Sequence, residues 1–474
     1  MFSKRLCKPS KLTISLTLTL FLVQSGCSLA PQLTVPVIQT PTSLTTETLQ
    51  VKAAWWKDFK NDALNALIEE ALNNSDDLKL QALRVLKAKQ AYGLSNAARY
   101  PTLNANAGAS RIKLSDETYQ HNRTEYSDHT LGTSLQYELD FWNKLEGQSE
   151  ANWATFLGTK AARDTVKNTL INDIVLAYFN LASLDERIAI MDETITTYEQ
   201  SYAFREKQLL AGVINDLLAN QAKAQFNNAK SLKASLLESR TLQENALAIL
   251  VGKSPKALFE KNHTLRYTLP SAIVIPKGVP SLLMENRPDI HEALENLKSK
   301  NALIGVEKSA YFPSISLTGS YGQQSQSLNN ILQSSANKWS FGPTLNVPIF
   351  DFDRIKTRVS MSETDLKSAL VSYELSVKKA YKEVSDALTR YNTAQSKLTF
   401  QSEELGAYTK MLDITTKRFD QGAANQLEVL DARKGMLSTS LSLVSTKQAL
   451  LSAEAELFKA LGGGWNEATL LNEK

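Results

Sequence analysis

The chain has 474 residues, of which 43% are hydrophobic and 22% are charged, and this composition excludes an intrinsically disordered protein. Its two cysteines, Cys7 and Cys27, both lie near the start, which excludes a disulfide framework and a cysteine-rich metal site. The sequence contains no GxxxxGK[ST] phosphate loop, no HExxH pair and no apolar run of 20 residues, so it also excludes a membrane-spanning helix.

Residues 1–26 have the pattern of a signal peptide. Four basic residues precede the apolar stretch LTISLTLTLFLV, which is too short to cross a bilayer. The whole chain has 53 basic and 49 acidic residues, and removal of this segment makes the two numbers equal. The basic character of the full chain therefore comes from the signal, and we expect no nucleic-acid partner.

The end of this signal, Ser25-Gly26-Cys27, resembles the lipobox of bacterial lipoproteins. The resemblance implies cleavage before Cys27, a covalent diacylglycerol and N-acyl chain on that residue, and a lipid-anchored segment over 27–60; we expect no other cofactor. Ser28 stands where an aspartate would signal inner-membrane retention, so the outer membrane is favoured. Gln24 departs from the leucine that the lipobox prefers, and the alternative is an ordinary secretory signal with an incidental cysteine.

Two tandem copies make up most of the remaining chain. Five landmarks recur in the same order at an offset of 210 or 212 residues, which is typical of an internal repeat. The matching pairs are Ser75–Leu78 with Arg287–Ile290, Tyr100–Leu103 with Phe312–Ile315, Leu135–Trp142 with Leu345–Phe352, Ala211–Asn215 with Gln421–Asn425, and Leu250–Gly252 with Ala460–Gly462. We therefore predict a first copy over 61–255, a proline-rich connector over 256–285, a second copy over 286–464 and a C-terminal tail over 465–474.

Each copy begins with a helix, expected over about 62–98 and 282–311, and continues with two segments in which apolar and polar residues alternate. The alternation predicts half-buried strands, and a length of about ten residues suits a tilted membrane strand. The expected strands are about 103–113 and 130–141 in the first copy and about 314–322 and 339–350 in the second. A soluble four-stranded sheet packed on helices is the alternative.

Four strands are too few to close a barrel. Two chains would supply eight strands, whose interior is filled by side chains, whereas three chains would supply twelve and leave a water-filled lumen. We therefore expect a homotrimer if the strands form a barrel.

Long helical stretches without proline follow the strands of each copy. In 366–412 apolar residues recur at spacings of three and four, which is the heptad seam of a coiled coil, and the stretch from Val166 to Met191 has the same pattern. Each stretch breaks at a glycine, Gly212 or Gly422, where a second helix is expected to return. Helices of about 60 residues reach ~90 Å at ~1.5 Å per residue, a length suited to bridging a wide aqueous gap.

Five motifs together resemble the outer-membrane efflux channel family (TolC-like) and, within it, the lipoprotein drug-efflux branch (NodT/OprM-like). They are Trp55-Trp56-Lys57-Asp58-Phe59, Arg287-Pro288-Asp289-Ile290, Pro348-Ile349-Phe350-Asp351, Leu427-Glu428-Val429-Leu430-Asp431-Ala432 and Leu461-Gly462-Gly463-Gly464-Trp465. One departure follows the third motif: the family usually has glycine next, whereas Phe352 stands here, so the bend into the following helix is expected to form differently.

The resemblance implies a mainly α fold with a membrane β-barrel, in which two tandem repeats trimerise into a twelve-stranded barrel plus a twelve-helix periplasmic tunnel. It also implies an outer-membrane channel without enzymatic activity. Such a channel docks a periplasmic membrane-fusion (adaptor) protein and, through it, an inner-membrane pump.

The resemblance also places a periplasmic gate on two residues, Leu427 as a hydrophobic constriction and Asp431 as a ring of carboxylates. Lys434 stands three residues after Asp431, and from this spacing we expect it to pair with Asp431 and latch the closed state. The alternative is that Leu427 packs in the seam between helices while Asp431 faces solvent. The residues expected at the helix-turn tips, for adaptor contact, are Leu210, Gly212, Val213, Asn215, Leu217, Gly422, Ala423 and Asn425.

The favoured function is export of small molecules such as drugs and toxic compounds through a tripartite pump. Type I protein secretion and metal-ion efflux are the alternatives, and a passive porin is disfavoured because it needs only short periplasmic turns. No metal site is expected: His121 and His129 lie in a polar loop that is more typical of solvated surface.

Overall fold

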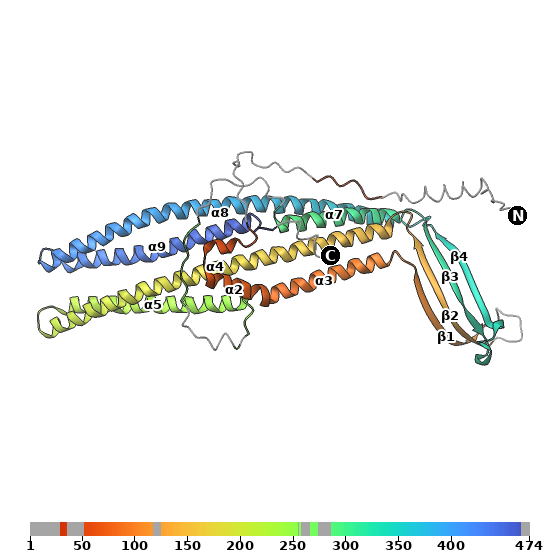
Figure 1. Cartoon of the computed structure of the whole chain (residues 1–474), viewed down its shortest axis with the longest axis horizontal. Helices are drawn as coiled ribbons and strands as arrows, with labels where there is room; N and C mark the ends of the chain where they lie inside the picture. The colour runs from red at the N-terminus through yellow and green to blue at the C-terminus, as the bar shows by residue number, and fades with distance from the viewer. Residues whose placement is uncertain are drawn as a thin grey trace, which may run out of the picture. The chain divides into compact units, whose positions relative to one another are not determined.

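The repeat in the sequence is also a repeat of helices and strands. The computed structural model describes residues 29–35, 52–115, 117, 125–254, 256, 266–273 and 286–465. Equivalent helices have equal lengths (Figure 1): 22 residues in α3 (Asp76–Ala97) and α7 (Pro288–Ser309), 67 in α4 (Lys144–Leu210) and α8 (Arg354–Asp420), and 35 in α5 (Asp216–Leu250) and α9 (Gln426–Ala460). The predicted mainly helical fold with two tandem repeats is confirmed.

The chain divides into two compact units, and each is described by itself. Residues 85–159 and 292–373 of the first unit contain the four strands and the helix segments that adjoin them, and the second unit holds the other helical segments. The second unit begins with η1 (Trp55–Phe59) and α2 (Asp62–Asn74). A single helix was expected over 62–98, but Ser75 has ψ of 127° and so separates α2 from α3.

The first unit contains one four-stranded antiparallel sheet with its strands in chain order. They are β1 (Thr102–Lys113), β2 (Glu125–Leu139), β3 (Ser314–Ser325) and β4 (Asn337–Asn346), and η3 (Leu328–Asn330) and η4 (Ser334–Ala336) lie between β3 and β4. The two repeats meet where β2 pairs with β3. Within the described residues, β1 and β4 each pair on one side, so the sheet has two unpaired edges.

Two strand ends differ from the expected ones. β4 ends at Asn346 rather than near 350, because Pro348 has no amide hydrogen to donate to a neighbouring strand. β2 begins at Glu125 rather than near 130, and Glu125 pairs with Lys113 at the far end of β1. Part of the polar segment between the two predicted strands is therefore strand.

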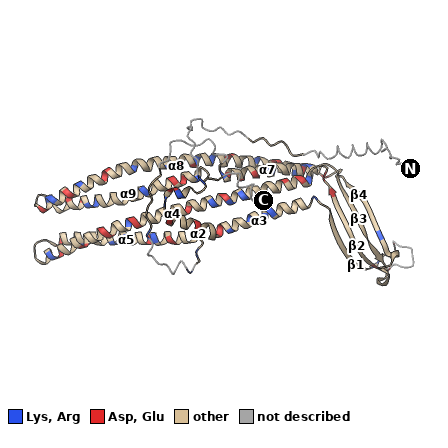
Figure 2. Cartoon of the chain, viewed as in Figure 1, with Lys and Arg blue, Asp and Glu red and all other residues tan. Residues whose placement is uncertain are grey.

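The strand register sorts the sheet into an apolar and a polar face. Across the four strands, one row consists of Leu103, Leu135, Gly319 and Phe341, and the next row consists of Asn104, Ser134, Ser320 and Ser340. The apolar face is open in the single chain, where Trp339 is 75% exposed. Charged side chains are sparse on the strands and frequent along the helices (Figure 2). The sheet therefore has one surface suited to an apolar medium and one suited to water.

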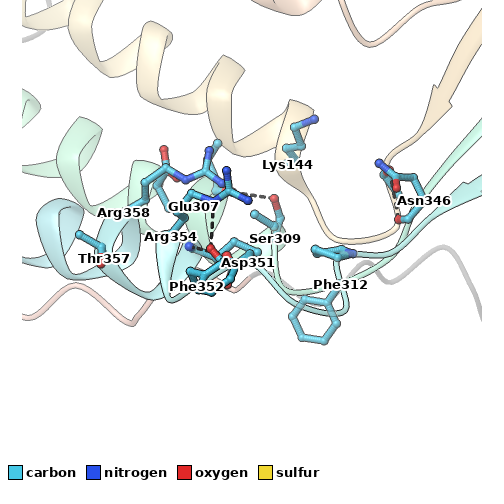
Figure 3. Close-up of a pocket in the computed structure, with 15 residues that line it drawn as sticks. Lys144, Glu307, Ser309, Phe312, Asn346, Asp351, Phe352, Arg354, Thr357 and Arg358 are labelled. Atoms are coloured by element: carbon cyan, nitrogen blue, oxygen red, sulfur yellow. Dashed lines mark hydrogen bonds and ion pairs between the residues drawn. The ribbon is translucent and has the colours of Figure 1, made fainter.

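The bend from β4 into α8 forms without glycine. Phe352 and Asp353 both have positive φ, 54° and 61°, a region that residues with side chains rarely adopt. Asp351 supports the bend, because its Oδ2 accepts the amide of Ile355 at 2.8 Å and its carbonyl accepts Nε of Arg354 at 2.9 Å. A cavity of about 880 Å³ opens beside this bend (Figure 3). The sequence predicted that this bend would form without the usual glycine. It forms through two residues in the left-handed backbone region, Phe352 and Asp353, and through the side-chain cap of Asp351.

In the first unit α7 packs against two long helices. On one side, Oγ1 of Thr155 in α4 lies 3.1 Å from Oγ of Ser299. On the other side, Nζ of Lys300 lies 3.3 Å from Oδ2 of Asp365 in α8. Leu297 on the same helix is fully buried.

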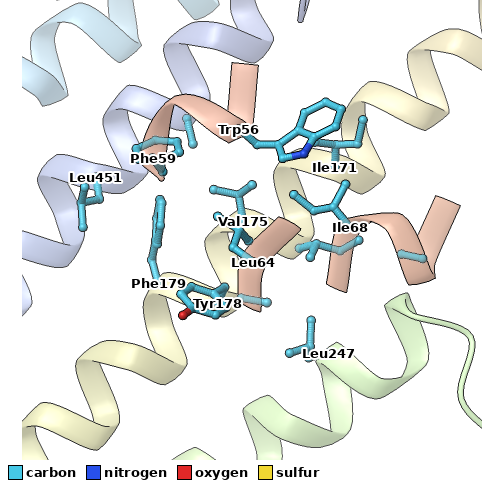
Figure 4. Close-up of a cluster of buried hydrophobic side chains, with 14 of the residues drawn as sticks. Trp56, Phe59, Leu64, Ile68, Ile171, Val175, Tyr178, Phe179, Leu247 and Leu451 are labelled. Carbon is cyan, nitrogen blue, oxygen red and sulfur yellow. The ribbon is translucent and has the colours of Figure 1, made fainter. Parts of the chain in front are cut away.

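The core of the second unit is built on aromatic residues from segments far apart in the sequence. Trp55 stacks on Phe458 of α9 with ring centroids 5.4 Å apart, and Phe59 meets Phe179 of α4 edge-on at 5.1 Å. Leu64 of α2 is fully buried in the same cluster (Figure 4). The Trp-Trp-x-x-Phe motif therefore contributes the core that joins η1 and α2 to α4 and α9.

A buried arginine holds the end of α9. Arg287 donates to the carbonyl of Ala460 at 2.7 Å and pairs with Asp289 at 2.7 Å and Glu383 at 2.8 Å. Burial alone would lower the pKa of Arg287, but its bonds to Asp289 and the charge of Glu383 raise it overall. The arginine of the Arg-Pro-Asp motif therefore stays charged inside the second unit, because hydrogen bonds and ion pairs compensate for its burial.

The predicted heptad seam of α8 is largely buried as far as Ala394, whereas its later members are half-buried in the single chain: Leu398, Leu405, Tyr408 and Leu412. Val377, Ala380, Val384, Ala387 and Ala394 all belong to the core of the second unit. Tyr391 packs beside this seam, near Leu457 of α9. Among the described residues, none of the helices is both long enough and apolar enough to cross a membrane.

Candidate functional site

The two long helical hairpins, α4–α5 and α8–α9, end in the same kind of turn. The amides of Gly212 and Val213 donate to carbonyls three and five residues back, both at 2.9 Å, and Gly422 and Ala423 do the same at 2.9 and 2.8 Å. This pair of bonds ends a helix through a residue with positive φ. The φ values are 68° at Gly212 and 71° at Gly422, which explains glycine at both turns.

Asparagine caps start the returning helices. Oδ1 of Asn215 accepts the amide of Leu218 at 3.4 Å, and Oδ1 of Asn425 accepts the amide of Glu428 at 3.0 Å. In the second turn, Oε1 of Glu428 also accepts the amide of Asn425 at 3.3 Å, and Arg418 lies 3.7 Å from the same carboxylate. The second turn therefore has the more complete set of capping bonds.

The turn residues expected to contact a partner are exposed in the chain. Leu210 is 85% exposed, more than the two other large apolar side chains of this set, Val213 and Leu217. The other exposed members of this set are Gly212, Val213, Asn215, Leu217, Gly422, Ala423 and Asn425. Exposed apolar side chains gathered at a turn are typical of an interaction surface, so adaptor contact stays a prediction with a suitable surface.

Leu427, Asp431 and Lys434 follow one another along α9 at spacings of four and three. They line a groove of about 570 Å³ whose other walls come from α5 and from Tyr198 of α4. Burial raises the pKa of this Tyr198, and the positive charge of Arg433 acts in the opposite direction. Leu427 is 61% exposed, so it does not pack in a seam of its own chain.

The expected latch between Lys434 and Asp431 does not form within the described chain. Both side chains are exposed, and neither belongs to an ion pair there. An exposed pair of this kind gains only about 0–1 kcal/mol and must order two flexible side chains. Within one chain, the two residues contribute separate charges along α9.

Arg205 joins the two hairpins, and the sequence analysis did not identify it. It lies on α4 and donates to Oε1 of Gln426 on α9 at 2.6 Å, and its guanidinium lies 5.5 Å from the ring centroid of Phe419 on α8. A further bond to Gln208 at 2.8 Å orients the guanidinium. Thr415 occupies the equivalent place in the second repeat, so the comparison of repeats held no signal for this contact.

The predicted lipid anchor, Cys27, lies outside the described residues, as do His121 and most of the connector and tail. Lipid attachment therefore stays a prediction. Among the described residues, His, Cys, Asp and Glu side chains form no group of three or more that would hold a metal ion.

A two-faced sheet with open edges, followed in each repeat by a long helical hairpin, is the arrangement expected of an outer-membrane channel. The sequence profile described as outer membrane efflux protein matches residues 67–253 and 279–463. The chain belongs to this family, and the interpretation of the sequence as an outer-membrane efflux channel is confirmed.

Curated relatives match over almost their whole length. The chain is 33% identical to the cation efflux system protein CusC of Escherichia coli O6:H1, over 97% of this chain and 99% of that protein. It is 31% identical to the solvent efflux pump outer membrane protein SrpC of Pseudomonas putida, over 95% of this chain and 98% of that protein. Relatives named for different cargoes are thus similar to this chain to nearly the same degree.

A solved structure supports the fold. The Campylobacter jejuni CmeC outer membrane channel superposes with a TM-score of 0.88 at 25% identity, covering 93% of this chain and 96% of that one. This agreement extends over the strands and the helical hairpins together, so the architecture is that of an efflux channel over nearly the full chain.

Proposed function

We propose that three copies of this chain form the outer-membrane exit duct of a tripartite efflux pump. The observation that carries the proposal is the two-faced sheet with unpaired edges at β1 and β4. Unpaired strand edges are unfavourable in a membrane, where no water satisfies their hydrogen bonds. Pairing β4 of one copy with β1 of the next removes both edges, and three copies close a ring of twelve strands.

The polarity of each face of the sheet indicates whether that face would contact lipid or line the lumen of such a ring. The apolar face with Trp339 and Phe341 would contact lipid, and the polar face with Ser134, Ser320 and Ser340 would line the lumen. Oγ of Ser320 and Oγ of Ser340 lie 2.7 Å apart, so neighbouring strands already share a polar network on that face. Hydroxyl groups of this kind suit a water-filled passage without binding one cargo tightly.

The helix turns form the gated periplasmic end in this proposal. Three copies of Asp431 around an axis would attract cations and repel one another, and three copies of Leu427 would narrow the same passage. The exposed turn residues, with Leu210 and Val213 foremost, would receive the adaptor protein. Cys27 would carry the lipid that anchors each copy to the outer membrane.

The proposed cargo is a set of small organic compounds delivered by the pump and adaptor. The lipobox-like Cys27 and the Trp-Trp-x-x-Phe motif, buried as Trp55 to Phe59, support the drug-efflux branch. Metal-cation efflux is the second candidate, because a relative at 33% identity is named for cation efflux and Asp431 would favour cations.

Two measurements on the purified full chain test the duct. Its mass in detergent should be that of a trimer, and in planar bilayers it should give small, flickering, cation-preferring currents. A monomer without current would contradict the duct. Growth in the presence of organic toxicants and of metal salts, with and without the chain in a deletion host, separates the two cargoes. Mass spectrometry of the N-terminal peptide, with Cys27→Ser as control, reports lipid attachment.

A further inference from the structure

The cavity of about 880 Å³ beside the bend from β4 into α8 is built by several elements of the first unit (Figure 3). Its walls come from the start of α4, the end of α7, the start of α8 and the adjoining ends of β3 and β4. We call it the bend cavity. A volume of this size suits a small organic molecule rather than a single ion.

The bend cavity opens on the polar side of the sheet. Ser314 and Asn346 are the strand residues that line it, and they pair with each other in the register. The next pair along the two strands, Ile315 and Leu345, belongs to the apolar face. Because successive residues of a strand point to opposite faces, Ser314 and Asn346 lie on the face that would line the lumen of the proposed ring.

The segment 29–35 supports the same side. It lies on α7, where Nδ2 of Asn301 donates to the carbonyl of Pro31 at 2.9 Å and a Cβ on Gly305 would lie 2.8 Å from the amide nitrogen of Ala30. A lipid on Cys27 would lie in the bilayer, so the segment that follows it runs outside a closed ring. Val306 and Ala310 line the bend cavity and lie one turn apart on another side of α7.

Most charges of the bend cavity are compensated within the chain. Nζ of Lys144 lies 2.9 Å from Oε1 of Glu138, and Nε of Arg358 lies 3.9 Å from Oε2 of Glu307. The carboxylate of Asp351 accepts a backbone amide at the start of α8. These groups therefore have partners before any ligand enters.

Arg354 is the exception. Its Nε donates to the carbonyl of Asp351 at 2.9 Å, and its guanidinium has no ion pair among the described residues. Comparison of the repeats explains this: Lys144 and Arg354 are the first residues of α4 and α8, but the equivalent of Glu138, 210 residues later, is Pro348. The first turn of α8 also contains no acidic residue. One guanidinium without a carboxylate partner in the described chain therefore lines the cavity.

The remaining walls define the kind of molecule that fits. Val306, Phe312 and Ile355 supply apolar surface beside Arg354. A guanidinium donates through a planar fork that matches the two oxygens of a carboxylate. The bend cavity thus combines one cation that has donors to spare with apolar walls, which suits a small organic molecule that carries a carboxylate.

We propose that the bend cavity binds small organic carboxylates on their way through the passage and that Arg354 receives the carboxylate. This site rests on the proposed duct and names a charge class within its cargo. It lies at the opposite end of α8 from the turn at Gly422 and is separate from Asp431. A carboxylate that the pump has driven past the repelling charge of Asp431 would meet cations at the start of α8.

Binding of naphthalene carboxylate to the purified full chain in detergent tests the site, because this probe is fluorescent and ionised at neutral pH. Arg354→Gln should weaken its binding about tenfold or more. Lys356→Gln is the matched control and should bind like the wild type. Lys356 belongs to the same turn of α8, is exposed, and lies outside the lining of the bend cavity. Naphthalene carboxamide, the same ring without the charge, should bind weakly to all three proteins.

A second variant covers the case in which Arg354→Gln disturbs the bend. Glu307→Gln leaves Arg354 and its bond to Asp351 in place and removes the carboxylate beside Arg358. It should therefore tighten the binding of naphthalene carboxylate several-fold, which a disturbed fold would not do. Weaker or unchanged binding in Glu307→Gln would contradict the charge-based recognition.

Planar-bilayer recordings separate the site from the duct. Naphthalene carboxylate should reduce the single-channel current of the wild type and leave that of Arg354→Gln unchanged. A conducting trimer that does not bind the probe, or that binds it equally well as Arg354→Gln, overturns the site and leaves the duct. Binding through Arg354 without an effect on the current would place the cavity off the passage and overturn the proposal. A monomer without current overturns the duct, and the binding measurement in detergent still decides whether Arg354 receives the carboxylate.

Discussion

Arg205 and Gln426 belong to different repeats and are joined by a hydrogen bond of 2.6 Å close to the two hairpin turns. The same guanidinium lies over the ring of Phe419, so one side chain holds both α8 and α9 against α4. A hydrogen bond from a charged guanidinium is stronger than one between neutral groups, and the contact with the aromatic ring adds to it. Truncation of the arginine side chain to alanine removes both interactions. Arg205 therefore holds the turn at Gly212 close to the turn at Gly422.

Arg205→Ala is expected to loosen the turns and to raise the single-channel conductance of the reconstituted chain. Lys207→Ala is the matched control, because Lys207 is an exposed cation on the same helix without an ion pair among the described residues. Planar-bilayer recordings of both variants compare the two. Equal conductance in Arg205→Ala and Lys207→Ala would mean that this bond has no part in closing the passage.

Asp431→Asn is expected to reduce the cation preference of the channel and to raise its conductance. Three carboxylates around an axis attract cations strongly enough to retain them and repel anions, and the amide removes both effects. Reversal potentials in a salt gradient measure the preference. Glu403→Gln, a carboxylate exposed on α8 away from the turns, removes the same charge and should leave both quantities unchanged. An unaltered reversal potential in Asp431→Asn would remove Asp431 from the passage.

Glu454 gives the second unit a dependence on pH. Its carboxylate is fully buried and accepts one amide bond from Ile273 at 3.1 Å, and among the described residues its other oxygen has no hydrogen-bond partner. Burial raises the pKa of Glu454 from 4.5 to about 7, although the bond from Ile273 opposes the shift. Because the folded pKa exceeds the unfolded one, the folded state is favoured below pH 4.5 and loses this advantage as the pH rises through about 7.

Glu454→Gln is therefore expected to raise the thermal stability at pH 8 relative to the wild type and to make it less dependent on pH. The difference available is roughly 3 kcal/mol, because the pKa rises from 4.5 to about 7 and each tenfold change in proton affinity corresponds to ~1.36 kcal/mol. Thermal melts in detergent at pH 5 and pH 8 measure it. Glu456→Gln is the control, because this carboxylate lies two residues away, is only half-buried and pairs with Arg390 at 2.5 Å instead of lying unpaired in the core. Parallel losses of stability with pH in both variants would exclude Glu454 as the cause.

The fold was largely predictable because its signals are periodic. The alternation in 130–141 assigns one face of a strand to apolar residues, and the spacing of three and four in 366–412 assigns one face of a helix to them. Leu135 lies on the apolar face of the sheet and Val384 is buried, as these patterns predict. Ser75 was missed, because a single residue leaving the helical region does not disturb an otherwise continuous pattern.

The site was less predictable, because its contacts join single residues without a repeating partner. Leu427 and Asp431 were placed on one side of α9 by their spacing, and the groove is lined as that spacing requires. Arg205 carried no such signal, since its partner Gln426 lies 221 residues away and its equivalent in the second repeat is Thr415. In the described single chain Lys434 and Asp431 do not pair, since proximity in sequence does not outweigh the freedom of two exposed side chains, and their role as a latch of the closed state stays a prediction.

The C-terminal glycine motif makes a prediction about folding that contrasts two glycines. Gly462 has φ of 98°, and a Cβ there would lie 1.8 Å from the carbonyl oxygen of Asn286. The carbonyl oxygen of Gly462 accepts a hydrogen bond from Nδ2 of Asn168 at 2.9 Å, so the turn cannot move away from Asn286 without losing this bond. Gly406 lies inside α8 with nothing within 4 Å of its added Cβ.

Gly462→Ala is therefore expected to destabilise the second unit by at least about 1–3 kcal/mol, the cost of a strained backbone, with the contact to Asn286 adding to it. Gly406→Ala should instead stabilise it by about 1 kcal/mol, because alanine favours a helix interior over glycine. Both variants make the same chemical change, so a thermal melt separates the role of the position from that of the residue type. Equal shifts in the two variants would mean that the close approach of Asn286 does not constrain this turn in solution.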